Sequence, residues 1–130
     1  MDEKKKIFII DDDTFLLDMY TLKFREKGFE VESSTSGEDA LNRFRKGYKP
    51  DVILFDVVMP GVDGLEMLEV IQKENLLPDT LLIALSNQGE DRDIELAKER
   101  GADDYIVKAN MIPSEVLDIV SKVIDERLSK

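Results

Sequence analysis

Five polar residues stand where short apolar runs end: Asp11, Asp12, Asp56, Ser86 and Lys108. Together they offer three carboxylates, one hydroxyl and one ammonium group. Carboxylate oxygens are ligands that hard divalent cations accept, and an ammonium or hydroxyl group suits the oxygens of a phosphoryl group. If the five side chains converge in space, we expect a site for a divalent cation and a phosphoryl group.

The apolar runs before these residues predict buried strands, at residues 7–10, 52–55, 81–85 and 105–107. Helix-like segments alternate with them, which favours a parallel α/β sheet. The carboxyl ends of parallel strands form one rim, where ligands bind. A fifth strand is predicted at residues 29–33, where apolar and polar residues alternate as in a strand with one solvent-exposed face. Its edge character favours the order 2-1-3-4-5.

Five helices are expected between and after the strands. The first covers residues 14–27 and is followed by Gly28, and the second follows Ser36 as N-cap. The others are expected to begin near Asp63, Asp91 and Pro113. The fourth has few apolar residues, with Ile94, Leu96 and Ala97 as its core contacts, while Val116, Val120 and Val123 are predicted to face inward from the last. The fold class is therefore a doubly wound five-stranded parallel sheet with five helices.

The composition limits the classes of function. The chain of 130 residues is predicted to form one domain, residues 1–130, and its net charge of −11 argues against direct binding to nucleic acid. No apolar run reaches the roughly 18 residues of a membrane span, and no signal-peptide core follows the charged start of the chain, so a cytoplasmic protein is expected. Histidine and cysteine are both absent. Their absence excludes Ser-His triads, cysteine nucleophiles and the usual zinc sites, and leaves oxygen ligands for any metal.

Four segments carry a resemblance to a known family: residues 7–13, 51–64, 84–86 and 101–108. The most specific is the Asp-x-x-Met-Pro-x-x-Asp-Gly element that begins at Asp56. Over nearly its whole length the chain resembles a receiver (CheY-like) domain of a two-component response regulator. The resemblance implies a flavodoxin-like sheet and a phosphorylation-activated signalling switch. It also implies no enzymatic role beyond self-catalysed phosphotransfer and autodephosphorylation.

The resemblance also implies roles for single residues. Asp56 would be the phosphoacceptor. Asp11 and Asp12 would hold Mg²⁺, together with a carboxylate oxygen of Asp56 and the backbone carbonyl of Val58. Three such carboxylates repel one another by roughly 3 kcal/mol per pair, which a bound cation offsets.

The remaining roles concern the phosphoryl group and its consequences. Ser86 and Lys108 would each contact a phosphoryl oxygen, and Tyr105 would turn inward as an aromatic switch. The fourth helix, fifth strand and last helix would then present a changed surface to a partner, an output domain or a second copy in a phosphorylation-dependent dimer. Because the chain has no histidine, the phosphodonor would be a histidine kinase or a histidine phosphotransfer protein.

Two departures from the family pattern and two alternative functions stay open at this point. Ala109 follows Lys108 where the family usually has proline after a cis peptide bond, and Asn87 follows Ser86 where the family usually has alanine. The first alternative is a haloacid-dehalogenase-like phosphatase, whose first motif is faintly similar to residues 11–14. The second is a degenerate receiver that serves only as a binding scaffold.

Overall fold

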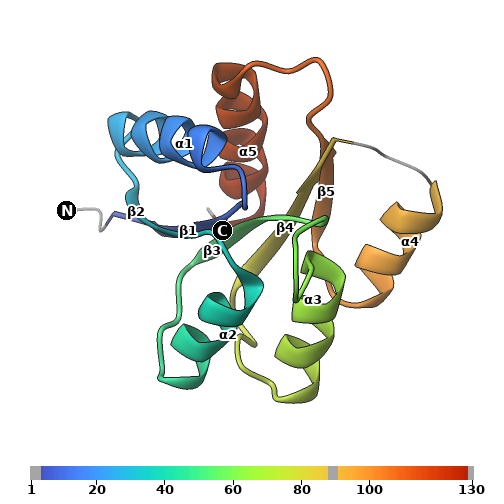
Figure 1. The fold of residues 1–130 in the computed structure, drawn as a ribbon. Helices are drawn as coiled ribbons and strands as arrows, with labels where there is room; N and C mark the ends of the chain where they lie inside the picture. The colour runs from blue at the N-terminus through green and yellow to red at the C-terminus, as the bar shows by residue number, and fades with distance from the viewer. Residues whose placement is uncertain (1–3, 88–90, 129–130) are drawn as a thin grey trace.

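Five parallel strands form one sheet in the order β2-β1-β3-β4-β5 in the computed structural model of the chain. The predicted order is confirmed, and a helix follows every strand (Figure 1). The structure describes residues 4–87 and 91–128, so the first residues of the charged amino-terminal segment lie outside it. The elements are β1 (Lys6–Ile10), α1 (Thr14–Glu26), β2 (Glu30–Ser34), α2 (Gly37–Arg45), β3 (Val52–Asp56), α3 (Gly64–Lys73), β4 (Leu81–Ser86), α4 (Asp91–Glu99), β5 (Asp104–Val107) and α5 (Pro113–Leu128).

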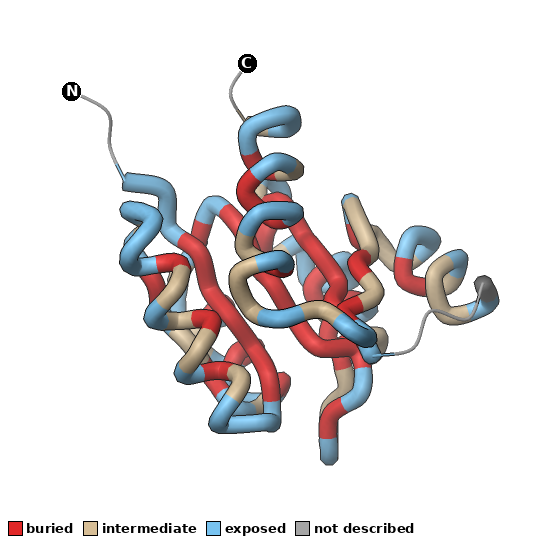
Figure 2. The backbone as a smooth tube through the Cα atoms, turned by 90° about the horizontal axis from the view of Figure 1, so that it is seen from above, coloured by how far each residue is buried: buried red, intermediate tan, exposed pale blue. Residues whose placement is uncertain are grey.

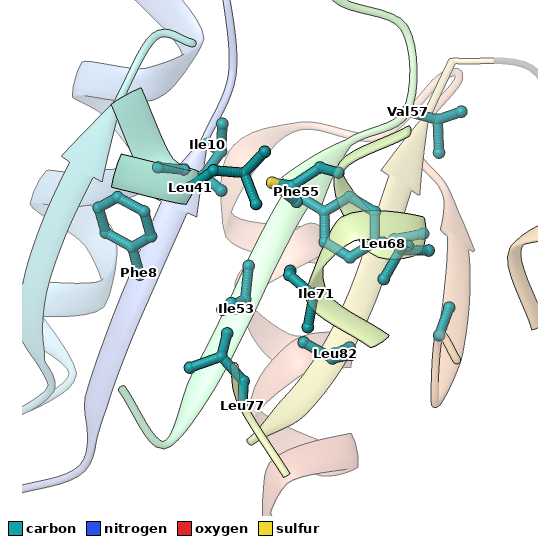
Figure 3. Close-up of a cluster of buried hydrophobic side chains, with 14 of the residues drawn as sticks. Phe8, Ile10, Leu41, Ile53, Phe55, Val57, Leu68, Ile71, Leu77 and Leu82 are labelled. Atoms are coloured by element: carbon teal, nitrogen blue, oxygen red, sulfur yellow. The ribbon is translucent and has the colours of Figure 1, made fainter. Parts of the chain in front are cut away.

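Helices cover both faces of the sheet, with α1 and α5 on one face and α2, α3 and α4 on the other (Figure 1). Successive strand residues supply the two cores in turn, because side chains alternate across a strand. In β1, Ile7 and Ile9 pack with α1 and α5, whereas Phe8 and Ile10 pack on the opposite side. Figure 3 shows the second of these clusters. The inner strands β1, β3 and β4 consequently form a buried band through the molecule (Figure 2).

Side-chain caps fix the starts of three helices. Asp13, Ser36 and Asp63 each accept a hydrogen bond from a main-chain N–H three residues further on, as expected for Ser36. Gly28 has φ +107°, a conformation that glycine adopts without steric cost, and it directly follows the C-cap residue of α1. These caps make the polar residues after β1, β2 and β3 part of the helix starts rather than of free loops.

The expected boundaries and faces need small corrections. The helix α1 ends one residue earlier than predicted, and β2 is shifted by one residue toward the carboxyl end. In α5, Val123 is only half-buried and Ile124 is buried instead. In α4 only Ala97 is buried among the three expected core contacts, which agrees with its weak apolar face. No helix within the described ranges has the length and hydropathy that a membrane span requires.

Candidate functional site

The five polar residues at the strand ends meet in one pocket of about 450 Å³ at the carboxyl edge of the sheet. The pocket lies where β1 and β3 are neighbours, which is the point where the strand order reverses. The lining residues are Asp11, Asp12, Asp13, Leu16, Asp56, Val57, Val58, Ser86, Asn87, Asp93 and Lys108. The sequence predicted the convergence, and it is confirmed.

The two aspartates after β1 are placed differently. Asp11 is buried, and its Oδ1 accepts a hydrogen bond from the main-chain N–H of Asp13 at 2.9 Å. Asp12 is exposed and stands open to solvent at the mouth of the pocket. Asp13 caps α1, because its Oδ1 accepts from the N–H of Leu16 at 3.1 Å. The acidic run therefore contains one fixed carboxylate, one accessible carboxylate and one cap.

Asp56 is the last residue of β3, and the turn after it is tightly packed. Its Oδ1 accepts a hydrogen bond from the N–H of Val58 at 3.2 Å. A Cβ on Gly64, the first residue of α3, would lie 2.6 Å from the main-chain oxygen of Asp56, so the chain needs glycine there. Burial raises the pKa of the Asp56 carboxyl, with the Lys108 charge opposing the shift and the Asp11 charge adding to it. The side chain nevertheless remains accessible through the pocket.

Lys108 joins the two buried carboxylates. Its side chain is 4% exposed, and Nζ donates to Asp11 Oδ2 at 3.1 Å and lies 3.6 Å from Asp56 Oδ2. Burial alone would lower the pKa of this ammonium, but the charges of Asp56 and Asp11 outweigh burial and raise it. The peptide bond between Lys108 and Ala109 is trans, as are the others in the described ranges. The lysine thus reaches the site without the cis peptide bond that is usual in the family.

Ser86 and Tyr105 lie beside this centre. Ser86 is buried at the end of β4, and its main-chain oxygen accepts from the N–H of Lys108 at 2.7 Å. Tyr105 lies in the edge strand β5, half-buried, and packs against the core cluster below α3 and α4. Asn87 is exposed and lines the pocket. The main chain of Ser86 is therefore paired with that of Lys108, both residues line the pocket, and Tyr105 is on the same side of the sheet as α4.

The donor set fits a hard divalent cation. Asp11, Asp12 and Asp56 each offer one carboxylate oxygen, and these oxygens lie within 4.8 Å of one another. Mg²⁺ is bound in proteins by one or two carboxylates with several waters, so an open pocket with three oxygens suits it. Val58 lies in the wall of the pocket. The use of its backbone carbonyl as a ligand remains a prediction.

Sequence reasoning missed three residues of the pocket wall: Leu16, Val57 and Asp93. Leu16 and Val57 lie close in the sequence to predicted site residues, so they could have been predicted from that proximity. Asp93 belongs to the first turn of α4, seven positions after Ser86, and no motif marks it. Its place in the pocket therefore comes from the three-dimensional structure and not from a sequence pattern.

Most of the chain is similar in sequence to response regulators. Residues 7–122 match the family described as response regulator receiver domain. The chain is 36% identical over 112 residues to the transcriptional regulatory protein AfsQ1 of Streptomyces coelicolor, covering 86% of this chain and 47% of that protein. It is 31% identical over 120 residues to the DNA-binding response regulator MtrA of Mycobacterium tuberculosis, covering 92% of this chain and 49% of MtrA. The chain spans about half the length of these relatives.

Solved structures agree with the sequence matches. The chemotaxis response regulator CheY4 of Vibrio cholerae superposes with a TM-score of 0.83 at 25% identity, covering 93% of this chain and 99% of that one. The beryllofluoride-activated receiver domain of DrrB superposes with a TM-score of 0.77 at 29% identity, covering 95% and 99%. These matches favour the receiver over a haloacid-dehalogenase-like phosphatase. With its fold and the match over residues 7–122, the chain belongs to the response regulator receiver domain family.

Proposed function

We propose that this receiver domain accepts a phosphoryl group on Asp56 with the help of Mg²⁺ and acts as a phosphorylation-controlled switch. One observation carries the proposal. The buried Lys108 ammonium lies within 4 Å of carboxylates from two different strand ends, at 3.1 Å from Asp11 and 3.6 Å from Asp56. A lysine held at this place supplies positive charge beside a nucleophilic carboxylate, which is what transfer of a phosphoryl group requires.

The chemistry uses few groups. A carboxylate oxygen of Asp56 attacks the phosphorus atom of the donor, the new P–O bond forms, and the donor's P–N bond breaks in line with it. The leaving imidazole nitrogen keeps the electron pair. Lys108 and the Ser86 hydroxyl then bind phosphoryl oxygens. Asp11, Asp12 and Asp56 would hold Mg²⁺, which would supply the remaining positive charge.

The donor we propose is a phosphohistidine on a histidine kinase or a histidine phosphotransfer protein, since the chain itself contains no histidine. Exposed apolar side chains in the segments after three strands support a protein donor rather than only a small molecule. Phe15, Val58 and Ile112 are 72%, 73% and 60% exposed, and they follow β1, β3 and β5, the strands that deliver Asp11, Asp56 and Lys108. Exposed apolar groups around a polar centre are typical of protein contact sites.

The output we propose is a change of the surface formed by α4, β5 and α5. Movement of Ser86 toward the phosphoryl group would let Tyr105 turn in beside it and shift α4, in a pre-existing equilibrium that phosphorylation biases. That surface would contact an output domain, a partner protein or a second phosphorylated copy. AfsQ1 and MtrA are named as transcriptional or DNA-binding regulators. We propose that any DNA contact is made outside this acidic domain, that the protein is cytoplasmic, and that the domain has no enzymatic role beyond its own phosphorylation and dephosphorylation.

Acetyl phosphate with Mg²⁺ tests the phosphoacceptor directly. The intact mass should rise by one phosphoryl group in the parent and in Asp79→Asn, whose carboxylate is exposed near the opposite edge of the sheet. Asp56→Asn should not gain the label. A parent that never gains mass, with this donor or with phosphohistidine, would favour the degenerate receiver. Full labelling of Asp56→Asn would place the phosphoacceptor elsewhere.

Amide NMR shifts on addition of beryllofluoride and Mg²⁺ test the switch. We expect large changes over residues 86–108 and along α5. Tyr105→Ala should keep the changes next to Asp56 but weaken those on α4, because the aromatic ring links the two. If the parent changes only next to Asp56, the domain binds the phosphoryl group without signalling through this surface.

A further inference from the structure

Asp93 lines the pocket that contains Asp56, and its carboxylate is not among the three that could hold a cation. It lies in the first turn of α4 and is half-buried. Among the described residues that line the pocket, it is the one that α4 contributes. The other charged groups of the lining come from the segments after β1 and from the ends of β3 and β5. Asp93 therefore acts on this pocket from a separate element.

Negative charges outnumber positive ones among the described residues that line the pocket. The described residues supply five carboxylates and one ammonium: Asp11, Asp12, Asp13, Asp56, Asp93 and Lys108. Three of the carboxylates are close enough to share a cation, and the Asp13 side chain caps α1. Asp93 lies outside this group of three carboxylates.

A carboxylate on the wall acts in opposite directions on the two ligands of the pocket. It attracts a divalent cation to the unphosphorylated site. It repels an added phosphoryl group, which brings about two negative charges. Groups within about a Debye length still interact at ordinary ionic strength, and less so in strong salt.

We propose that Asp93 sets the charge selectivity of this pocket, favouring entry of the divalent cation and disfavouring the phosphoryl group on Asp56. Asp93 would thereby lower the fraction of domain that stays phosphorylated at a given donor concentration. The inference rests on the proposed function of Asp56. It concerns a residue outside the set that binds the cation and the phosphoryl group.

Two binding measurements on Asp93→Asn test this selectivity. The dissociation constant for Mg²⁺ alone should rise about threefold, and that for beryllofluoride at saturating Mg²⁺ should fall about fivefold, as expected for one charge acting across a solvated pocket. Glu95→Gln is the matched control, because it removes the same charge from an exposed position of α4. Asp93→Glu should behave like the parent, and strong salt should shrink both effects.

The opposite signs separate charge from structural damage. A variant that merely disturbs α4 would weaken both ligands, and so would the loss of a direct Mg²⁺ ligand; either result overturns the inference. Constants equal to those of Glu95→Gln overturn it as well. If the parent itself does not bind beryllofluoride with Mg²⁺, the proposed function fails first. If the parent binds it and Asp93→Asn matches the control, only the selectivity is wrong.

Discussion

Replacement of Lys108 by methionine removes a buried ammonium from between two buried carboxylates. Nζ lies 3.1 Å from Asp11 and 3.6 Å from Asp56, so Coulomb's law at an effective dielectric near 20 gives roughly 5 kcal/mol for each contact, before the cost of desolvation. Removing one partner of a buried ion pair costs about 3–5 kcal/mol, because the other charge stays buried. In EDTA, we expect Lys108→Met to lower the free energy of unfolding by about 3 kcal/mol.

A double-mutant cycle with Asp56→Asn shows how much of this loss comes from the pair. Burial raises the pKa of Asp56, so its ionised form is disfavoured and Asp56→Asn should stabilise the metal-free domain. In the Lys108→Met background the same replacement should stabilise the domain by about 1.5 kcal/mol more than it does in the parent, because no ammonium offsets the carboxylate there. The coupling energy is therefore about 1.5 kcal/mol.

Urea unfolding followed by far-UV circular dichroism supplies the four free energies. Asp79→Asn, at an exposed position, serves as the control for removing a carboxylate and should change stability by less than about 0.5 kcal/mol in both backgrounds. Effects of Lys108→Met and Asp56→Asn that add within about 0.5 kcal/mol would refute the reasoning. The ammonium would then contribute no net stabilisation through Asp56.

Three other predictions concern pH, metal and packing. The folded-state pKa of Asp56 lies above its ordinary value of 3.8, so metal-free stability should fall as pH rises through the interval between the two values, and the advantage of Asp56→Asn should grow from about pH 4 to pH 7. An advantage that is constant across that range in urea unfolding contradicts this. Mg²⁺ should raise the melting temperature of the parent, and Asp12→Asn should lose most of that response; an equal response removes Asp12 from the site. Gly64→Ala should lower the free energy of unfolding by about 2 kcal/mol, since its Cβ would meet the Asp56 main-chain oxygen, and parent-like stability would show that the turn can relax.

The strands and the site could be predicted from the sequence because each strand is a short apolar run that ends in a polar residue. The faces of the helices were harder. In α5, the buried residues Val116, Val120, Ser121 and Ile124 define a face turned away from Val123, because the helix packs against α1 as well as the sheet. A 3.6-residue period of apolar residues predicts that a helix has a buried face, but the packing of the neighbouring helix determines which residues that face contains.

The site shows the same division. Asp11, Asp56 and Lys108 are predictable because strand ends must meet at one rim. The burial of Asp11 beside an exposed Asp12 was not predictable. It depends on the turn before α1, in which the Asp11 carboxylate accepts a hydrogen bond from the N–H of Asp13. Asp93 was not predictable either, because it lies inside a helix, away from the strand ends, and no local pattern marks it.

The hydrogen bond from Lys108 to Asp11 spans 97 positions of the chain. On a ribosome, Asp11 and Asp56 emerge well before the lysine that completes their pocket, by roughly 3–10 s for Asp56 at usual elongation rates. A growing chain at that stage carries the carboxylates but not the ammonium beside them. Nascent protein should therefore be a poor substrate for the proposed phosphodonor, and only chains made at least as far as β5 and the loop after it should compete for its phosphoryl groups.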